Sequence, residues 1–110
     1  MKDREAMCPK FEAAMKLLGK RWTGLVIRVL LDGPARFSEM AGQIPEMSDR
    51  MLAERLRELE AEDVVRRDVY PETPVRIEYC LTDKGRALAP VMEQVHAWAD
   101  AWLLAASTTA

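Results

Sequence analysis

Residues 36–81 read RFSEMAGQIPEMSDRMLAERLRELEAEDVVRRDVYPETPVRIEYCL. Apolar residues recur at helical spacing in residues 37–44 and again in residues 49–62, and Pro45 interrupts the pattern between them. After the second helical segment the apolar residues alternate with polar ones, as they do in a half-buried strand. Two alternating segments flank residues 70–74, which contain two prolines and lack the Asn-Gly of a tight turn. The stretch therefore predicts helix, turn, helix and a β-hairpin with an extended tip.

This order of elements is that of a winged helix-turn-helix, in which the second helix fits the major groove of DNA and the hairpin reaches the backbone or the minor groove. A chain of 110 residues is long enough for one hydrophobic core and too short for two ordinary domains. We therefore expect one domain over residues 1–110, mainly α-helical with a small β-hairpin, whose DNA-reading core is residues 36–81.

The composition is typical of a folded protein, with 49% hydrophobic and 31% charged residues. No apolar run approaches the ~18 residues that span a bilayer, and residues 1–10 are charged where a secretory signal is hydrophobic, so we expect a cytoplasmic protein. Cys8 and Cys80 are far apart and lack companions at zinc-site spacing, so neither a disulfide framework nor a metal is expected. No pattern typical of a catalytic site or a cofactor-binding loop occurs, and the sequence indicates neither an enzyme nor a cofactor.

The formal net charge of −2 argues weakly against nucleic-acid binding, because proteins that contact many phosphates usually carry an excess of Lys and Arg. The charge is unevenly distributed. Residues 20–57 carry seven Lys or Arg and five Asp or Glu, whereas residues 58–63 carry four acidic residues and no basic one. This segregation is compatible with a basic face on an acidic protein, and also with an ordinary solvated surface.

The helix expected at residues 49–62 has two distinct faces when its residues are placed about 100° apart. Four apolar residues between Met51 and Leu59 fall within one arc, which predicts the side that packs on the core. Arg55 lies on the flank of that arc, so we expect it to pack or pair within the protein. The opposite face and the start of the helix, where Ser48 is the expected N-cap, are expected to meet DNA. Its residues are Ser48, Asp49, Arg50, Ala53 and Arg57.

Different roles are expected within this DNA-binding surface. Arg50, with Ser48 or Asp49, is expected to contact base edges, and Arg57 a phosphate. In the second arm of the hairpin Arg76 alternates with the apolar residues, so it is the expected phosphate contact of the wing, with Arg66 or Arg67 as weaker candidates. Arg36 and Ser38, at the start of the helix expected at 37–44, complete the phosphate contacts.

Helical patterns also flank the core, in residues 8–19 and about 83–106, and Thr82 supplies an N-cap for the second of them. Its apolar stripe is longer than a small winged domain needs to cover its own core, so we interpret the two helices as a dimer interface. The alternative is that the last helix folds back on its own domain. The residues expected at the interface are Phe11, Met15, Leu88, Val91, Met92, Val95, Trp98 and Trp102.

Six strings extend across the chain: LGKRWT (18–23), GPARFSEM (33–40), SDRML (48–52), RLRELE (55–60), VYPETP (69–74) and EYCLTDKG (78–85). Together they resemble the HxlR-type transcriptional regulators, winged helix-turn-helix proteins related to the MarR group. The similarity runs from Cys8 to Trp98 in the family's order and spacing. It implies a homodimer that binds double-stranded operator DNA through residues 48–62 and regulates transcription, by default as a repressor. Asp63 stands where the family usually has a glycine that ends the recognition helix.

The resemblance also implies a role for Cys8, because some members of this family sense oxidants, quinones or aldehydes through a cysteine near the amino terminus. A thiol at the start of a helix gains thiolate character from the helix dipole. Cys8 is therefore a candidate thiol sensor for a small electrophile or oxidant, and the alternative is a structural cysteine beside the dimer interface. Cys80, in the middle of a strand, is expected to be inert.

Two further alternatives stay open. The first concerns the tryptophans, which either line an effector cavity or belong to the core and the interface: Trp22, Trp98 and Trp102. His96 is expected to lack an acidic partner. The second function compatible with the sequence is a winged-helix protein-interaction module without DNA binding, which the acidic net charge favours slightly.

Overall fold

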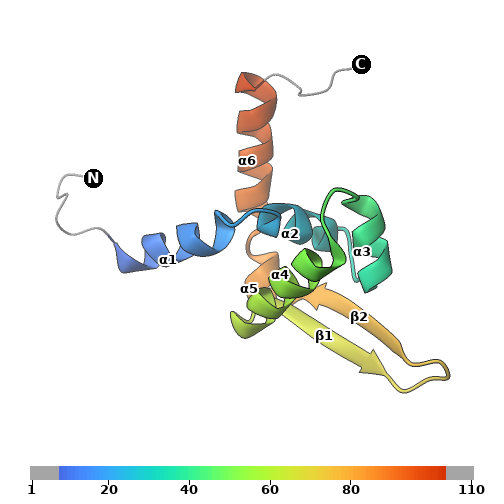
Figure 1. Ribbon diagram of the computed structural model, residues 1–110. Helices are drawn as coiled ribbons and strands as arrows, with labels where there is room; N and C mark the ends of the chain where they lie inside the picture. The colour runs from blue at the N-terminus through green and yellow to red at the C-terminus, as the bar shows by residue number, and fades with distance from the viewer. Residues whose placement is uncertain (1–7, 104–110) are drawn as a thin grey trace, which may run out of the picture.

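The computed structural model describes residues 8–103, in which six helices and one two-stranded sheet follow one another along the chain (Figure 1). The helices are α1 (Pro9–Leu18), α2 (Thr23–Leu31), α3 (Phe37–Gln43), α4 (Asp49–Ala61), α5 (Asp83–Arg86) and α6 (Ala89–Trp102). The strands are β1 (Val65–Tyr70) and β2 (Arg76–Leu81). α3 and α4 form the predicted helix-turn-helix, and the hairpin is its wing.

The core lies where α2, α3 and α4 meet the base of the hairpin. α2 is the central helix, because its Val26 and Ile27 have no exposed surface, and Met40 of α3 is equally buried. On α4 the buried residues are Leu52, Leu56 and Leu59, while Met51 at the edge of the predicted arc is half buried. The side of α4 that packs on the core is therefore the one that its periodicity predicts.

The hairpin is antiparallel, with Val65 opposite Leu81 at its base and Tyr70 opposite Arg76 at its tip. Val65 and Leu81 are buried, whereas Val69 is exposed because the hairpin extends beyond the helices that cover its base (Figure 1). The expectation of a half-buried face along the whole hairpin is therefore wrong at the tip. The core reaches only the base of the hairpin, where it meets the helices.

A two-bond bridge fixes the wing to the helix-turn-helix. The backbone N–H of Ala35 donates to the carbonyl of Tyr79 at 2.9 Å, and the N–H of Tyr79 donates to the carbonyl of Ala35 at 2.8 Å. Ala35 immediately precedes the N-cap of α3. The start of α3 and the second strand of the wing are thus held together by backbone geometry, whatever their side chains.

α2 begins at Thr23, because Trp22 has a left-handed backbone (φ 78°) that no right-handed helix can include. The last helical segment differs from the expected one. The single helix expected at 83–106 is two helices, α5 and α6, and residues 104–106 lie outside the described part of the chain. Pro90 accounts for the break, since its ring is tolerated only in the first turn of a helix, where α6 has it.

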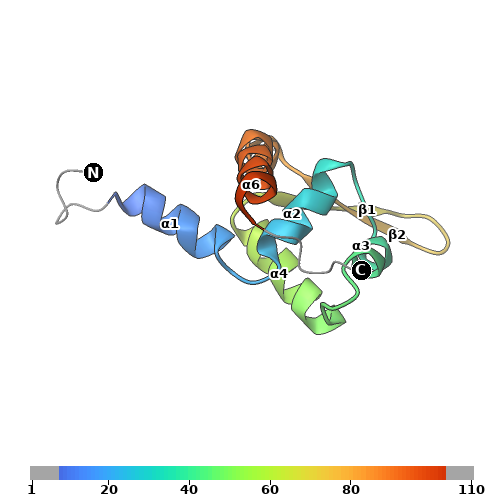
Figure 2. The ribbon, with the colours of Figure 1, turned by 90° about the horizontal axis from the view of Figure 1, so that it is seen from above.

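α1 and α6 project from the rest of the molecule in different directions (Figures 1 and 2). No residue of either helix is buried. The radius of gyration is 16.1 Å, against about 13 Å for a compact domain of this size. The two helices that flank the DNA-reading core are therefore arms that a single chain leaves largely uncovered.

Candidate nucleic-acid interface

The start of α4 is formed as its sequence predicts. The hydroxyl Oγ of Ser48 accepts a hydrogen bond from the backbone N–H of Met51 at 3.1 Å, which makes Ser48 the N-cap. Asp49 in the first turn complements the positive end of the helix dipole. The hydroxyl of Ser48 thus stabilises the start of the helix, and the exposed side of this residue is available to contact a nucleic acid.

The face of α4 opposite the core carries the remaining predicted contacts. Arg50 and Arg57 are exposed, and Ala53 between them is half buried. Within the described residues neither arginine forms an ion pair. Both guanidinium groups are therefore available for a phosphate or a base edge, on a helix whose other face is anchored in the core.

The start of α3 lies beside this face and is also exposed. The backbone N–H of Arg36 donates to Oε1 of Glu39 at 2.7 Å, which satisfies one of the donors left over at a helix start. The side chains of Arg36 and Ser38 are exposed, as the sequence predicts for phosphate contacts. The pKa of the Glu72 carboxyl group on the wing is lowered chiefly by its hydrogen bonds with Arg76 and to a smaller extent by the charge of Arg36.

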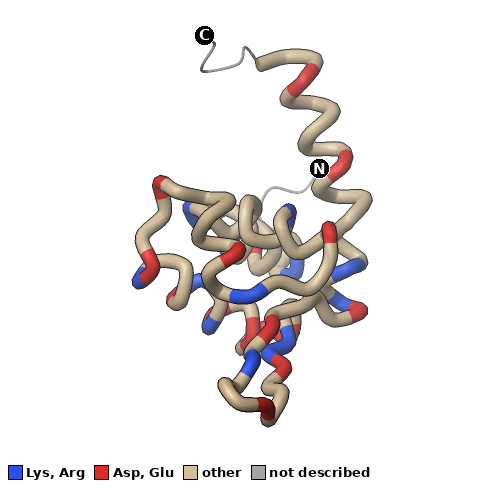
Figure 3. Tube along the Cα trace, turned by 90° about the vertical axis from the view of Figure 1, so that its right-hand side faces the viewer, with Lys and Arg blue, Asp and Glu red and all other residues tan. Residues whose placement is uncertain are grey.

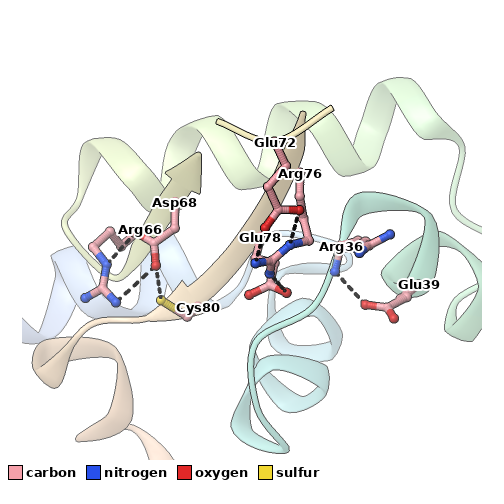
Figure 4. A network of polar contacts seen from close by, with 8 residues as sticks. All are labelled: Arg36, Glu39, Arg66, Asp68, Glu72, Arg76, Glu78 and Cys80. Carbon is pink, nitrogen blue, oxygen red and sulfur yellow. Dashed lines mark hydrogen bonds and ion pairs between the residues drawn. The ribbon is translucent and has the colours of Figure 1, made fainter. Parts of the chain in front are cut away.

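The wing differs most from expectation, because Arg76 is engaged within the protein (Figure 4). Its Nε and Nη2 donate to the two carboxylate oxygens of Glu72 at 3.3 and 3.0 Å, and its Nη1 donates to Glu78 at 2.7 Å. The guanidinium carbon lies 3.9 Å from the centre of the Tyr70 ring. The hydrogen bonds with Arg76 lower the pKa of Glu72, and those with Glu72 and Glu78 raise the pKa of Arg76.

The three charged groups of this cluster sum to −1, and only 27% of the Arg76 side chain is exposed. Arg76 is therefore not the unpaired phosphate contact that the alternation of the strand predicts. The alternation correctly gives the face on which Arg76 lies, but the loop at 71–75 returns Glu72 to the same face.

Arg66 and Arg67, at the base of the wing, are equivalent candidates in the sequence but have different partners in the structure. Arg66 donates to both oxygens of Asp68, at 2.9 and 3.2 Å, and this pairing lowers the pKa of Asp68. Arg67 is exposed and forms no ion pair within residues 8–103. Acidic and basic residues are interspersed along the hairpin, whereas the charged residues of α6 in Figure 3 are acidic. Arg67 is thus the arginine of the wing that, within residues 8–103, remains available for a phosphate.

Arg55 pairs within the protein, as its place on the flank of α4 predicts. Its Nε donates to the backbone carbonyl of Arg21 at 2.8 Å, and its Nη1 contacts both carboxylate oxygens of Glu58 at 3.2 Å. Only 14% of its side chain is exposed. The expectation that Arg55 pairs within the protein is confirmed.

The two cysteines lie in opposite environments. Cys8 is exposed and is the N-cap residue of α1, where a thiol meets the positive end of the helix dipole. Cys80 is buried and donates to Oδ2 of Asp68 at 3.6 Å, and burial raises the pKa of its thiol. A buried thiol with a raised pKa has little thiolate to react, which is consistent with the inert role expected for Cys80.

The arms carry most of the apolar side chains predicted for a dimer interface. Trp98 is 57% exposed and Trp102 is 75% exposed. Leu88 and Met92 instead pack partly against the core of their own chain, since they lie where α6 leaves the body. His96, expected to lack an acidic partner, lies 3.2 Å from Asp100 one helical turn away, so that expectation was wrong. Of the residues predicted for the interface, the following are exposed: Phe11, Met15, Val91, Val95, Trp98 and Trp102.

A winged helix-turn-helix whose second helix presents unpaired arginines to solvent is the architecture of a DNA-binding transcriptional regulator. A model of the HxlR-like helix-turn-helix family matches residues 17–107, and the chain belongs to this family. The uncharacterized HTH-type transcriptional regulator YvaP of Bacillus subtilis (strain 168) is 54% identical over 101 residues, which are 92% of this chain and 94% of YvaP. The interaction module without DNA binding is therefore not favoured.

Solved structures of a second regulator are similar in fold and sequence. The reduced form of YodB from B. subtilis has a TM-score of 0.81 and 57% identity, covering 88% of this chain and 95% of that one. Quinone-bound YodB has a TM-score of 0.77 and 52% identity, covering 87% and 100%. Within the described part of this chain, no helix combines the length and the apolar composition needed to cross a bilayer.

Proposed function

We propose that a homodimer of this chain binds an operator and represses transcription by occupying it. The observation that carries the proposal is the pair of arms. Amphipathic α1 and α6 contain no buried residue, yet they present Phe11, Trp98 and Trp102 to water. Large apolar side chains exposed on two uncovered helices are typical of an interface, and a second copy related by two-fold symmetry is their simplest cover.

The dimer would present two α4 helices to successive major grooves about one helical turn, ~34 Å, apart. In each half, Arg50 with Ser48 or Asp49 reads base edges, and Ala53 is positioned for an apolar contact with a base. Arg57, Arg36, Ser38 and Arg67 hold phosphates, which requires no catalysis and no cofactor. A regulator has to reach its operator, which lies in the cytoplasm. The proposed role therefore requires the cytoplasmic location that the sequence predicts.

We further propose that Cys8 makes this regulator responsive to electrophiles. The exposed thiol at the N-cap of α1 supports the proposal, as does the similarity to YodB, which has been solved with quinone bound. The thiolate would add to a ring carbon of the quinone, forming an S–C bond, and the thiol proton would end on a ring oxygen. One thiol per chain is sufficient for this addition, and Cys80 is buried.

An electrophoretic shift assay on the DNA beside the protein's own gene tests the proposal, with sedimentation equilibrium reporting the oligomeric state. A dimer that shifts the DNA at low salt, and is released by quinone, is expected. No shift by an intact dimer would exclude operator binding there, and a monomer at micromolar concentration would exclude the arms as an interface. Release that persists in Cys8→Ser would exclude Cys8 as the sensor.

A further inference from the structure

The direction of α1 depends on a short segment at its C-terminal end. Leu17 and Leu18, in the last turn of α1, pack partly against the core, but no residue of the helix is buried. A hollow of about 670 Å³ lies between α1 and the body, lined by residues such as Ala13 and Ala14 of α1 and Ala61 of α4. Figure 2 shows α1 extending away from the other helices. Its angle is therefore set at the segment that joins it to α2, residues 19–22, which we term the arm junction.

Side chains of α4 hold the arm junction. Nε of Arg55 donates to the carbonyl oxygen of Arg21 at 2.8 Å, and Nζ of Lys20 lies 3.1 Å from Oε2 of Glu58. Arg55 and Glu58 also contact each other, one turn apart on α4. The Arg55 side chain is 14% exposed, so its charge-assisted bonds are more shielded from water than an ordinary surface ion pair. The recognition helix thus contacts two successive residues of the arm junction.

The backbone of the arm junction is itself constrained. Trp22 has a left-handed backbone, which is uncommon for a bulky residue and persists only where its surroundings hold it. The guanidinium carbon of Arg21 lies 4.5 Å from the centre of the Trp22 ring, and Trp22 packs against the core. Because the arm junction is held by α4 and by the core, it fixes the angle of α1 relative to the body and does not act as a flexible hinge.

We propose that Arg55, Glu58 and Lys20 are positioning residues that fix α1 relative to the recognition helix and thereby set the half-site spacing of the operator. This inference rests on the proposed dimer. If the partner subunit docks on α1, a rotation of α1 at the arm junction moves the partner's α4 relative to this one. Arg50 and Arg57 lie on a different face of α4 from Arg55, so spacing and base recognition would be set by different residues of one helix.

The spacing of two half-sites on DNA is a sensitive measure of that angle. Each inserted base pair moves one half-site by about 3.4 Å and rotates it by roughly 34° around the duplex. The test uses the site that the wild-type protein selects from random-sequence duplexes, rebuilt with zero, one or two base pairs inserted or removed at its centre. Wild type is expected to lose about tenfold in affinity at each step.

Arg55→Met and Glu58→Gln remove the contacts while retaining much of the side-chain volume. Each is expected to reduce the loss per step to about threefold or less, and to leave the preference for the half-site bases unchanged. Arg28→Met is the matched control, since within residues 8–103 the one ion pair of Arg28 is with Asp32, away from the arm junction. The midpoint of thermal unfolding and the sedimentation coefficient establish that each variant is a folded dimer.

A folded, dimeric variant with a flattened spacing profile supports the inference, and one with the wild-type profile overturns it. If Arg55→Met does not fold, Glu58→Gln decides, because it is nearly isosteric and leaves the bond from Arg55 to Arg21 in place. A general loss of affinity, equal at every spacing and in both variants, overturns positioning in favour of plain destabilisation. Failure of the proposed function is distinguishable, because the wild-type protein would then select no two-part site at all.

Discussion

Arg50 is the residue on which sequence recognition is expected to depend. Its side chain is exposed on the solvent face of α4, and its helix is anchored by Leu52 and Leu56. Replacement by alanine should cost roughly 1–3 kcal/mol of binding free energy at the selected site and relax the preference at one base pair. Quantitative shift assays on single-base variants of the site measure both effects. An equal loss on every sequence would instead assign Arg50 to a phosphate.

Glu72 should limit the affinity of the wing for DNA, because it neutralises Arg76 and adds a negative charge near the phosphates. Glu72→Gln should raise affinity for every duplex by about threefold and steepen the salt dependence, with a change in slope below about 0.9 because Arg76 stays paired with Glu78. Arg76→Ala should leave the slope nearly unchanged, contrary to what an unpaired wing arginine would give.

The control for the wing is Glu93→Gln, which removes the same charge from exposed α6. Binding isotherms between 50 and about 300 mM salt separate a local effect from a change in net charge. If both glutamine variants alter the slope equally, the cluster around Arg76 has no special role in DNA binding.

The two thiols should differ in reactivity by position alone. Cys8 is exposed, whereas burial raises the pKa of Cys80 and shields its sulfur. Iodoacetamide at pH 8 should therefore add one group per chain rapidly, at Cys8, and a second only after unfolding in guanidinium chloride. Mass spectrometry of the intact chain and of Cys8→Ser measures this. Rapid labelling of native Cys8→Ser would contradict the buried position of Cys80.

At the scale of the element, the end of α4 is held by residues that follow the hairpin. Nζ of Lys84 donates to the carbonyl of Glu62 at 2.6 Å, and Oγ1 of Thr82 donates to the carbonyl of Asp63 at 2.6 Å. These contacts satisfy backbone carbonyl groups that have no hydrogen-bond partner within the helix at its C-terminal end. They join the end of the recognition helix to the start of α5, although the whole hairpin lies between these two segments in the sequence.

Asp63 ends α4 in a left-handed backbone, with φ of 61°. A residue without Cβ adopts this region at less cost, so Asp63→Gly should raise the free energy of unfolding by about 0.5–1 kcal/mol. Asp63→Ala should lower it by a similar amount, because alanine has neither the freedom of glycine nor the local hydrogen bonding of aspartate. Urea unfolding followed by circular dichroism measures both. A stabilising alanine would show that the backbone at this position is not strained.

At the scale of the whole molecule, the arms should be needed for assembly and not for the fold of one chain. Trp98 is 57% exposed and belongs to a helix without a buried residue. Trp98→Glu should raise the dissociation constant of the proposed dimer by roughly 30-fold and leave the core intact. Sedimentation equilibrium measures the dimer, and far-UV circular dichroism measures the fold.

Val75→Glu is the matched control for the dimer, since Val75 is equally exposed but lies at the wing tip. It should leave the dissociation constant unchanged. Weakened association in both variants would indicate a general effect of charge, and loss of folding in Trp98→Glu would show that α6 supports its own core. An unchanged dimer in Trp98→Glu would remove α6 from the interface.

Elements and their faces could be predicted from the sequence. Spacing of apolar residues predicted the order of helices and strands, the buried side of α4 and the exposure of Arg50 and Arg57. The N-cap at Ser48 followed from local chemistry, and the resemblance marked Asp63 as a position where the family usually has a glycine, which agrees with its left-handed backbone. Such features depend on residues a few positions apart, and one-dimensional patterns record them directly. The pair of His96 and Asp100, at i and i+4, could have been found in the same way.

The partners of the other charged groups depend on the fold. Arg76 is neutralised partly because a loop returns Glu72 to its side. Arg66 and Asp68, at i and i+2 on β1, share a face that the alternation alone predicts. Arg55 meets the carbonyl of Arg21, 34 positions away in the chain. A guanidinium attracts any carboxylate or carbonyl that the fold brings within reach, and spacing along the sequence does not reveal which one arrives. Periodicity along a sequence fixes the direction in which a side chain points, whereas an ion pair also depends on where the fold places the second charged group.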